Sequence, residues 1–563
     1  MRKGMGKGRP VLPQVLCGLA LCFTMLIFAP VEMVQINSVN FWFGVEDFLP
    51  LFVVLFFAAF AVLELVYALL RKLPYSLWLL SLSLLFGGLV CVYVQGTYLC
   101  MGSEVLDSGT PFWQGMFKEM MLNAAVWAAI LLGILALSLT KPKLFLKAVS
   151  AVSALILVME GTALVTLALD GGYNSDINHV YCSDEEQFTF SDNGDVIMIM
   201  LDTFDARLMD RAIEENPEYA NVFEDFTYYR NTSSSTIRTK SSFSSFMTGV
   251  VPDNSEPFFA YCRRAFKESR FLPAFKEAGM AVQVYTAPNG VLSVDQMPYV
   301  DNLRIRESHI SDKKAFVKEM LYMIGYRYMP TMLQPFTLRE YINDFDLMQE
   351  MGENGAPEST DVNTEFLNKL REDGVTVDAD RRFFKFFLLH GMHKNTQMNR
   401  YLEPTAPDNY AEQDDHYEAA LGCFAMLKEL FAELEEKDIY DKATVIVFGD
   451  HGIKDPEDWL CSTVMLVKYP GETGPMRISM APTELLDLRA TALYGAGINY
   501  EGNGTPVHLW EGTEHRDRRI LTHWRIGANS YEDYLPWLYE YAVPDDATDL
   551  DGYVSTGRVF KKE

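Results

Sequence analysis

The sequence predicts an α/β protein: five transmembrane helices followed by a domain with a mostly parallel central sheet flanked by helices. Two observations carry this prediction. Roughly the first 170 of the 563 residues form long apolar runs, whereas the remainder alternates short apolar stretches with helical patterns and polar segments. The near-zero mean hydropathy is then the average of two unlike parts rather than a property of one uniform domain.

The first part contains five apolar runs long enough to cross a bilayer. They lie at about residues 11–31, 48–70, 75–95, 122–140 and 146–169. Because four more runs follow it, the first is not a cleavable signal peptide. Lys and Arg gather before the first run and on the connections after the second and fourth, which places the N-terminus in the cytoplasm. With five crossings, everything after about residue 170 lies outside the cell.

The second part follows a Gly/Asp/Ser-rich linker and shows strand-like runs between helical patterns. We expect strands at 196–202, 281–287, 383–390, 444–452 and 463–470. We expect helices at about 256–278, 311–326, 336–351 and 410–437. Strands that alternate with helices indicate a mostly parallel sheet covered on both faces.

Residues suited to chemistry follow three of these strands. The first ends in Asp202, the third in His390 with His393 close behind, and the fourth in Asp450-His451 between two glycines. Ligands of open parallel sheets bind beyond the carboxyl ends of the strands. Three of the nine histidines fall at such ends, so we expect a functional site there rather than ordinary surface turns.

Asp202, Asp450 and His451 offer two carboxylates and one imidazole, a ligand set suited to Zn²⁺ or Mn²⁺. A fourth oxygen is available from Thr239, which lies in a Ser/Thr-rich segment ten residues before Gly249. A metal held this way would lower the pKa of the threonine hydroxyl and stabilise charge on a transferred group. Without the other residues, the same segment is an ordinary polar loop.

The segment around Thr239 also supplies positive charge, since its only cations are Arg238 and Lys240. We expect these two side chains to hold non-bridging oxygens of an anionic substrate. His393, with His390 as a second candidate, would donate a proton to the departing or bound oxygen. This constellation predicts transfer of a tetrahedral anion, phosphoryl or sulfuryl, through a covalent intermediate on Thr239.

Composition excludes two further classes of function. The net charge of −27 argues against a nucleic-acid partner, because a phosphate-binding surface needs a basic excess. The eight cysteines form no CxxC pair, so no structural zinc site is expected.

The order of these motifs resembles the sulfatase and alkaline phosphatase superfamily. The motifs are LDTFD, a Thr ten residues before the glycine of MTG, HGMH and FGDHG. Together with five spans, they make the chain similar to lipoteichoic acid synthases and related sulfatase-like transferases. The resemblance implies one divalent ion, Mn²⁺ or Zn²⁺ with Ca²⁺ or Mg²⁺ as alternatives, held by Asp202, Thr239, Asp450 and His451. It also implies that Thr239 becomes substituted and that His393 contacts substrate.

Two residues depart from the family pattern. Sulfatases carry Cys or Ser in a C-x-P-x-R signature that is oxidised to formylglycine, whereas this chain has TKSSF from Thr239 onward. Threonine cannot be converted in this way, which favours phosphotransfer over sulfate-ester hydrolysis. Asp202 stands where lipoteichoic acid synthases carry Glu. The nearby Asp205 is either a partner behind the ligands or, as we favour from sequence, an exposed surface acid.

These features predict four parts: a five-span transmembrane domain at 1–170, an extracytoplasmic linker at 171–194, a sulfatase-like catalytic domain at 195–500, and a C-terminal substructure packed on it at 501–563. The predicted function is metal-dependent transfer of phosphoglycerol or phosphoethanolamine from a phospholipid donor to an envelope glycan or lipid acceptor. The alternatives are hydrolysis of a sulfate or phosphate ester at the same site, or an inactive binding module.

One stretch has two competing interpretations. Residues 313–361 are rich in Met, Tyr and Phe at helical spacing. They form either a lid or lipid-facing platform, or a helix packed in the ordinary way against the sheet, which we favour from sequence.

Overall fold

The structure is a computed structural model whose chain divides into two compact units. The first comprises Met1–Asn178 and Glu307–Glu353, and the second comprises His179–Arg306 and Asn354–Glu563. The described residues are 9–36, 41–99, 117–169, 180–286, 291–305, 308–337, 348–351, 362–393, 397–405, 413–454, 460–522, 535 and 537–561. Each unit is described by itself.

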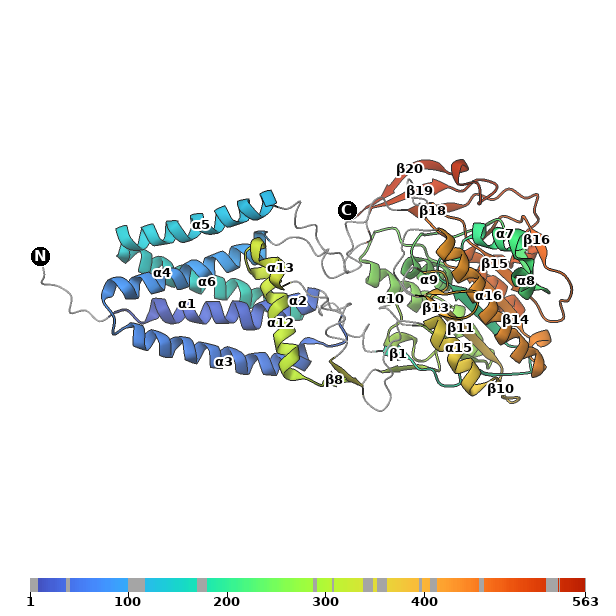
Figure 1. The fold of residues 1–563 in the computed structure, drawn as a ribbon, viewed down its shortest axis with the longest axis horizontal. Helices are drawn as coiled ribbons and strands as arrows, with labels where there is room; N and C mark the ends of the chain where they lie inside the picture. Colours follow the sequence, from blue (N-terminus) through green and yellow to red (C-terminus); the bar gives the residue numbers. More distant parts are fainter. Residues whose placement is uncertain are drawn as a thin grey trace, which may run out of the picture. The chain divides into compact units, whose positions relative to one another are not determined.

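The first unit contains five helices that are long and apolar enough to cross a membrane, as the sequence predicts (Figure 1). The candidate spans are Leu12–Gln35, Val45–Leu70, Tyr75–Leu99, Phe117–Thr140 and Pro142–Ala168. In the order of the chain, their helices are α1 (Leu12–Phe23), α2 (Ala29–Ile36), α3 (Val45–Leu70), α4 (Tyr75–Val94), α5 (Phe117–Thr140) and α6 (Pro142–Leu169). Large apolar side chains such as Val54, Phe57 and Leu132 are exposed on these helices, as expected where lipid replaces water.

A helix from the later sequence also belongs to the first unit. It is α12 (Lys313–Tyr328), and it follows β8 (Ser308–Ile310), which pairs antiparallel with β9 (Gln349–Met351). The favoured sequence interpretation placed this helix on the sheet, but the structure packs it against the membrane helices. The helix predicted at 336–351 falls mainly outside the described residues, and its last three residues form β9 instead.

The second unit is organised around a seven-stranded sheet in the order β16-β4-β15-β14-β3-β11-β6. The strands are β3 (Val196–Leu201), β4 (Thr227–Tyr229), β6 (Ala281–Tyr285), β11 (Phe383–Leu389), β14 (Thr444–Gly449), β15 (Met465–Lys468) and β16 (Arg477–Ser479). The strands β6, β11, β3 and β14 run parallel, whereas β15 is antiparallel to β14. The prediction of a mostly parallel sheet is thereby confirmed.

Strand register sets the position of the site. Leu201, the last residue of β3, is paired with both Leu389 of β11 and Gly449 of β14. The next residue of each strand is therefore Asp202, His390 or Asp450, and the three emerge side by side at one edge of the sheet.

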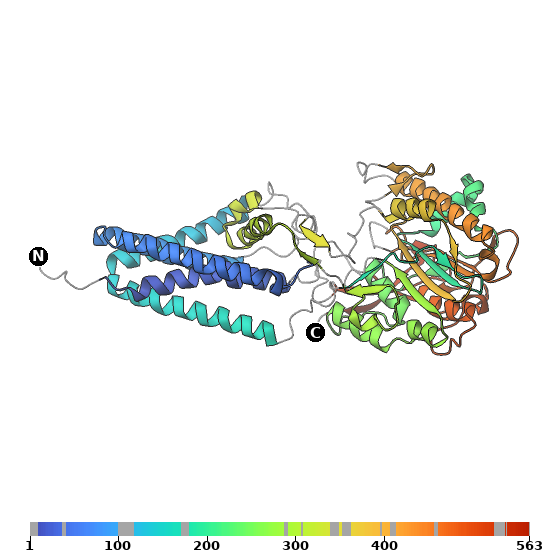
Figure 2. The ribbon, with the colours of Figure 1, turned by 90° about the horizontal axis from the view of Figure 1, so that it is seen from below.

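Both faces of the sheet are buried, which explains why its strands are continuous apolar runs rather than alternating ones. One face is covered by α15 (Val362–Asp373) and α16 (Gln413–Glu436), coloured yellow and orange in Figure 2. On the other face, aromatic side chains pack on the sheet from α9 (Thr239–Thr248) and α11 (Phe271–Glu277). The single helix predicted at 256–278 is broken into α10 (Phe258–Glu268) and α11, because Ser269 is extended.

A small antiparallel sheet near the C-terminus is formed by β18 (Arg519–Thr522), β19 (Leu538–Ala542) and β20 (Val554–Phe560). The backbone N–H of Leu521 in β18 donates to the Ser235 carbonyl at 2.9 Å. The buried Arg518 guanidinium donates to the Asn231 carbonyl at 2.7 Å. These bonds fix the loop that leads into Thr239.

Candidate active site

Three predicted ligands meet at the carboxyl edge of the sheet. One ligand atom from each of Asp202, Asp450 and His451 lies within 4.8 Å of the others, and all three side chains are buried. The parallel register of β3 and β14 brings Asp202 and Asp450 together although they lie far apart in sequence. No other group of this kind is found among the described residues.

The ligand atoms of this cluster differ in whether a hydrogen bond from the described residues already occupies them. Asp450 Oδ1 accepts from the backbone N–H of Thr203 at 3.1 Å and of His451 at 2.8 Å. Asp450 Oδ2 is buried and accepts no hydrogen bond from the described residues. His451 Nδ1 lies 2.9 Å from the Gly452 carbonyl, so it carries the proton and leaves Nε2 with a free lone pair. That nitrogen lies 3.4 Å from Asp450 Oδ2 and 3.9 Å from Asp202 Oδ1.

The electrostatics of the cluster favour a bound cation. Burial raises the pKa of Asp202, and the neighbouring Asp450 charge raises it further. Burial also raises the pKa of Asp450 and lowers the pKa of His451 to about 3. Two buried carboxylates beside a neutral imidazole are costly unless a positive charge is shared between them. The orphaned oxygen and the free imidazole nitrogen therefore fit a divalent metal ion.

Thr239 lies at the first position of α9, beside these ligands. Its hydroxyl donates to Asp202 Oδ2 at 3.1 Å, and the side chain is half-buried. The N-terminus of a helix carries partial positive charge, which stabilises an anionic group attached there. The hydroxyl of Ser242, one turn on, donates to the Asp450 carbonyl at 2.7 Å and holds α9 against the end of β14.

The turn carrying His390 and His393 is built against Asp202. The Met392 N–H donates to the Asp202 carbonyl at 2.9 Å, and the His393 N–H donates to the His390 carbonyl at 2.9 Å. The His393 side chain is exposed and lies close enough for its charge to lower the pKa of both Asp202 and His451. His390 is half-buried on the same turn.

The two predicted substrate cations flank Thr239 at the start of α9. Arg238 is half-buried at the N-cap position of α9, directly before Thr239. The Lys240 ammonium lies 5.9 Å from the ring centre of Phe259 in α10. Its role as a substrate ligand stays a prediction.

Sequence alone gives no functional prediction for two residues beside the site, Thr203 and Lys454, and a wrong one for Asp205. Asp205 is not a surface acid: it is buried, caps α7 (Ala206–Glu215), and accepts from the Ile453 N–H at 2.8 Å. It thereby holds the loop that follows His451. Thr203 has a left-handed backbone, φ 62°, and its hydroxyl donates to Asp202 Oδ1 at 2.8 Å.

Lys454 is the third, and it adds positive charge to the cluster. Its charge lowers the pKa of His451, and its own pKa is lowered first by burial. A lysine three residues after the histidine of FGDHG could have been singled out from the sequence. Thr203 gives no such signal, because nothing in LDTFD marks a left-handed residue.

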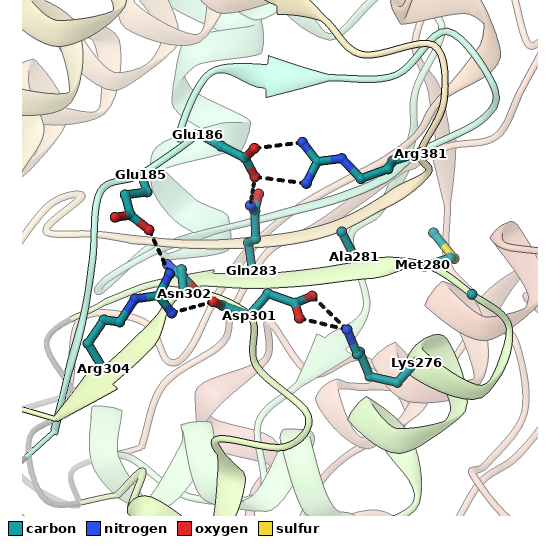
Figure 3. A pocket seen from close by; sticks show the side chains of 11 residues that line it. Glu185, Glu186, Lys276, Met280, Ala281, Gln283, Asp301, Asn302, Arg304 and Arg381 are labelled. Carbon is teal, nitrogen blue, oxygen red and sulfur yellow. Dashed lines mark hydrogen bonds and ion pairs between the residues drawn. The ribbon is translucent and has the colours of Figure 1, made fainter.

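A second concavity lies at the opposite, amino ends of β6 and β11. It has a volume of about 490 Å³, and Figure 3 shows that charged side chains line it. Each cation there is held by an acid at 2.6 Å: Lys276 by Asp301, Arg304 by Glu185 and Arg381 by Glu186. Because its charges neutralise one another, this pocket offers no site for an anionic substrate comparable to the cluster at Asp202.

Comparisons with solved structures give distant similarities. The lipoteichoic acid synthase LtaP from Listeria monocytogenes is 14% identical, with 66% of this chain and 90% of that chain covered and a TM-score of 0.35. A protein in the alkaline phosphatase superfamily from Vibrio parahaemolyticus is 12% identical, with 66% and 79% covered and a TM-score of 0.36. Ps i-CgsB, in complex with k-i-k-neocarrahexaose, is 13% identical, with 62% and 82% covered and a TM-score of 0.40. A search of curated proteins found no match.

A family profile gives the direct assignment. The profile described as Sulfatase matches residues 194–493, which is more than half of the chain. The matched range begins just before β3 and includes Asp202, Thr239, Asp450 and His451. The chain belongs to the sulfatase family.

Proposed function

We propose that the protein is a membrane-anchored transferase that moves a phosphoglycerol or phosphoethanolamine group from a phospholipid to an envelope glycan or lipid. The observation that carries the proposal is the Thr239 hydroxyl, held 3.1 Å from Asp202 Oδ2 at the N-terminus of α9. This hydroxyl is the nucleophile, and the buried Asp202, Asp450 and His451 beside it are the metal ligands.

The identity of residue 239 supports phosphorus rather than sulfur as the reacting centre. A sulfatase of the formylglycine type needs Cys or Ser at the nucleophile position, and this chain has Thr. A threonine hydroxyl forms a stable phosphodiester, from which the group can be passed to a second hydroxyl.

In the first step, Thr239 Oγ1 attacks the phosphorus of the donor phosphodiester. A new Oγ–P bond forms, and the P–O bond to diacylglycerol breaks. The proton of Thr239, which points to Asp202 Oδ2 in the structure, is released to solvent, and His393 gives a proton to the diacylglycerol oxygen. When bound, a divalent ion at Asp202, Asp450, His451 and Thr239 supplies Lewis acidity that favours the ionised hydroxyl.

In the second step, an acceptor hydroxyl attacks the same phosphorus. It gives its proton to His393, a new P–O bond forms to the acceptor, and the Oγ–P bond breaks as Thr239 regains a proton. Water as acceptor gives hydrolysis, which is the second candidate function at this site. The positive end of α9 and the charge of Arg238 stabilise the phosphoryl oxygens throughout.

The membrane helices support a phospholipid as donor. Five candidate spans keep the chain in the bilayer, where the donor resides. The distribution of Lys and Arg supports a catalytic unit outside the cytoplasm, where envelope acceptors would be available to it.

The test uses the full chain in detergent-phospholipid micelles with Mn²⁺ and labelled phosphatidylglycerol or phosphatidylethanolamine. We expect peptide mass spectrometry to find a phosphodiester adduct on Thr239, and none in a Thr239→Ala variant. The matched control is Ser241→Ala, which removes a hydroxyl of the same segment that bonds Thr236 instead of Asp202. Turnover of an aryl sulfate without any adduct on Thr239 would overturn the transferase and favour the hydrolase.

A further inference from the structure

Residues 313–337 lie in the middle of the catalytic sequence, the part of the chain from residue 179 onward. They nevertheless belong to the first unit, here called the membrane unit, and to its apolar core. Helix α12 is followed by a tight turn at Thr331–Leu333 and by α13 (Gln334–Thr337). Apolar residues of α12 are buried in one cluster with residues of α2, α3 and α4: Phe316, Met320, Met323 and Ile324 with Val31, Val34, Phe48, Phe52 and Val92. Figure 1 shows α12 running across the bundle beside α2.

Polar contacts fix the C-terminal end of α12. The Tyr328 hydroxyl donates to Glu32 Oε2 at 3.0 Å, and the Arg327 guanidinium pairs with the same carboxylate at 3.2 Å. Gly96, just after α4, lies so close to the Tyr328 ring that a Cβ there would overlap the ring. The helix therefore occupies a defined site on the bundle.

The polar backbone at the break after α12 finds hydrogen-bond partners within the protein, as the interior of a bilayer requires. It contains Pro330, which has no N–H, and the next N–H, of Thr331, donates to Asn123 Oδ1 in α5 at 3.1 Å. Asn123 in turn donates to Gln95 at 2.8 Å, and Gln334 donates to the Tyr326 carbonyl at 2.9 Å. Non-helical backbone is tolerated at membrane depth only where protein groups take its hydrogen bonds in this way.

The outer side of the turn is apolar and exposed. Phe336 is 72% exposed, Met332 47% and Leu333 44%. The turn contacts α5 near Asn123, where α5 exposes Phe117, Met121 and Leu122 to at least half of their surface. Exposed apolar residues of a candidate span and of the turn thus lie on two segments that are in contact, and lipid hydrocarbon is the occupant that suits both.

The N-terminal end of α12 carries two lysines next to the capping Asp312. Lys313 and Lys314, at its first turn, are both exposed. Lysines at the border of an apolar segment meet lipid phosphates, while the apolar part lies deeper.

We propose that residues 313–337 are a membrane-embedded element that lies in the lipid at the end of the bundle where α6 leaves for the catalytic sequence. Met332, Leu333 and Phe336 contact acyl chains, and Lys313 and Lys314 contact phosphates. The catalytic sequence therefore inserts into the membrane a second time, after the five spans.

The test is photocrosslinking of the full chain in vesicles of phosphatidylglycerol and phosphatidylethanolamine. In separate variants, p-benzoylphenylalanine replaces Phe336, Phe117 or Tyr494. Phe117 is the lipid-facing reference on α5, and Tyr494 is an exposed aromatic of the catalytic unit beside the start of β14. Adducts are identified by mass spectrometry of the crosslinked peptides.

We expect the Phe336 variant to form phospholipid adducts with a yield within about twofold of the Phe117 variant, and the Tyr494 variant to form at least tenfold less. A Phe336 yield as low as that of Tyr494, with Phe117 labelled, would overturn the proposal. So would a crosslink from position 336 to a second copy of the chain in place of lipid. Retained ion-dependent melting of each variant shows that the catalytic unit is folded.

Discussion

A Cβ atom on Gly391 would lie 2.6 Å from both the backbone nitrogen and the backbone oxygen of Asp202. Gly391 has φ 55°, so glycine is required at this position for its conformation as well as for space. Asn363 holds the turn from behind, with its side chain bonded to the Gly391 N–H and carbonyl at 3.2 and 3.1 Å. The turn that carries His393 is thereby fixed against Asp202.

A Gly391→Ala substitution is expected to displace Asp202. We expect Mn²⁺ affinity and turnover to fall about 10–100-fold, as when a partner behind a metal ligand is disturbed. Calorimetric titration with Mn²⁺ measures the affinity. The control is Gly279→Ala, where φ is also positive, 78°, but nothing lies within 4 Å of the new Cβ. Both variants lose about 1–2 kcal/mol of stability because alanine is placed in a left-handed backbone. Equal Mn²⁺ affinity in the two variants would therefore refute the role of the contact between position 391 and Asp202.

An Asp205→Asn substitution is expected to loosen the loop after His451. The amide can accept from only one of the donors that Asp205 now satisfies, the N–H groups of Arg207 and Ile453. We expect about 1–3 kcal/mol lower stability from the unsatisfied donor and a parallel fall in metal affinity. Asp210→Asn, on the same helix but paired with Arg230, serves as the control. Metal affinity unchanged in Asp205→Asn would show that the acid stabilises α7 alone.

Metal removal is expected to change how stability depends on pH. Burial raises the pKa of Asp202 and Asp450 above their unfolded values, and the Asp450 charge raises the pKa of Asp202 further, so these two groups bind more protons in the metal-free folded state than in the unfolded state. Their contribution to the free energy of unfolding then falls as pH rises from about 4 through the raised pKa values, whereas the lowered pKa of His451 contributes with the opposite sign. Thermal melts with EDTA measure this decline.

With a metal ion bound, the negative charges of the same carboxylates are neutralised. The free energy of unfolding then rises with pH instead of falling. At 100 times the dissociation constant, Mn²⁺ adds about 2.7 kcal/mol, and this increment is lost at low pH as protons compete for the ligands. An Asp450→Asn variant should show a flatter decline in EDTA and little gain from Mn²⁺. Parallel pH profiles with and without metal would contradict the assignment of these ligands.

A chain produced from residue 179 onward, which contains both the catalytic unit and α12, is expected to be insoluble without detergent. Such a chain exposes the buried face of α12, including Phe316 and Met320. Replacing residues 312–347 by a short Gly-Ser loop is expected to give a monodisperse protein, because the Ser311 N–H already bonds the Met348 carbonyl at 3.0 Å. Light scattering with and without detergent checks both chains, and a monodisperse protein that retains α12 would contradict the packing described here.

The clustering of Asp202 and Asp450 could be predicted because a parallel sheet gives a simple rule. Buried strands are continuous apolar runs, and the residue that ends each run lies at one edge, so Asp202 and Asp450 could be paired from sequence alone. Asp205 could not be placed, because its burial depends on the loop at Ile453 that folds over it. The left-handed backbone of Thr203 likewise results from contacts with Asp202 and Asp450 rather than from local preference.

The location of α12 could not be predicted for a different reason. Its helical pattern is readable, but an apolar helix surface fits a sheet and a helix bundle equally well. The decisive contacts, with Glu32, Gly96 and Asn123, come from residues that look unremarkable within their own spans. The predicted strands erred mainly at their ends, and β15 pairs antiparallel with β14.

The docking of α12 also determines what a protease can release. The chain passes between the two units three times, near residues 178, 306 and 353. A single cut before Val180 severs the five spans from the catalytic sequence but leaves α12 seated among α2, α3 and α4. Shedding of the enzyme from a cell would therefore require two further cuts around this helix, or its extraction from the bundle.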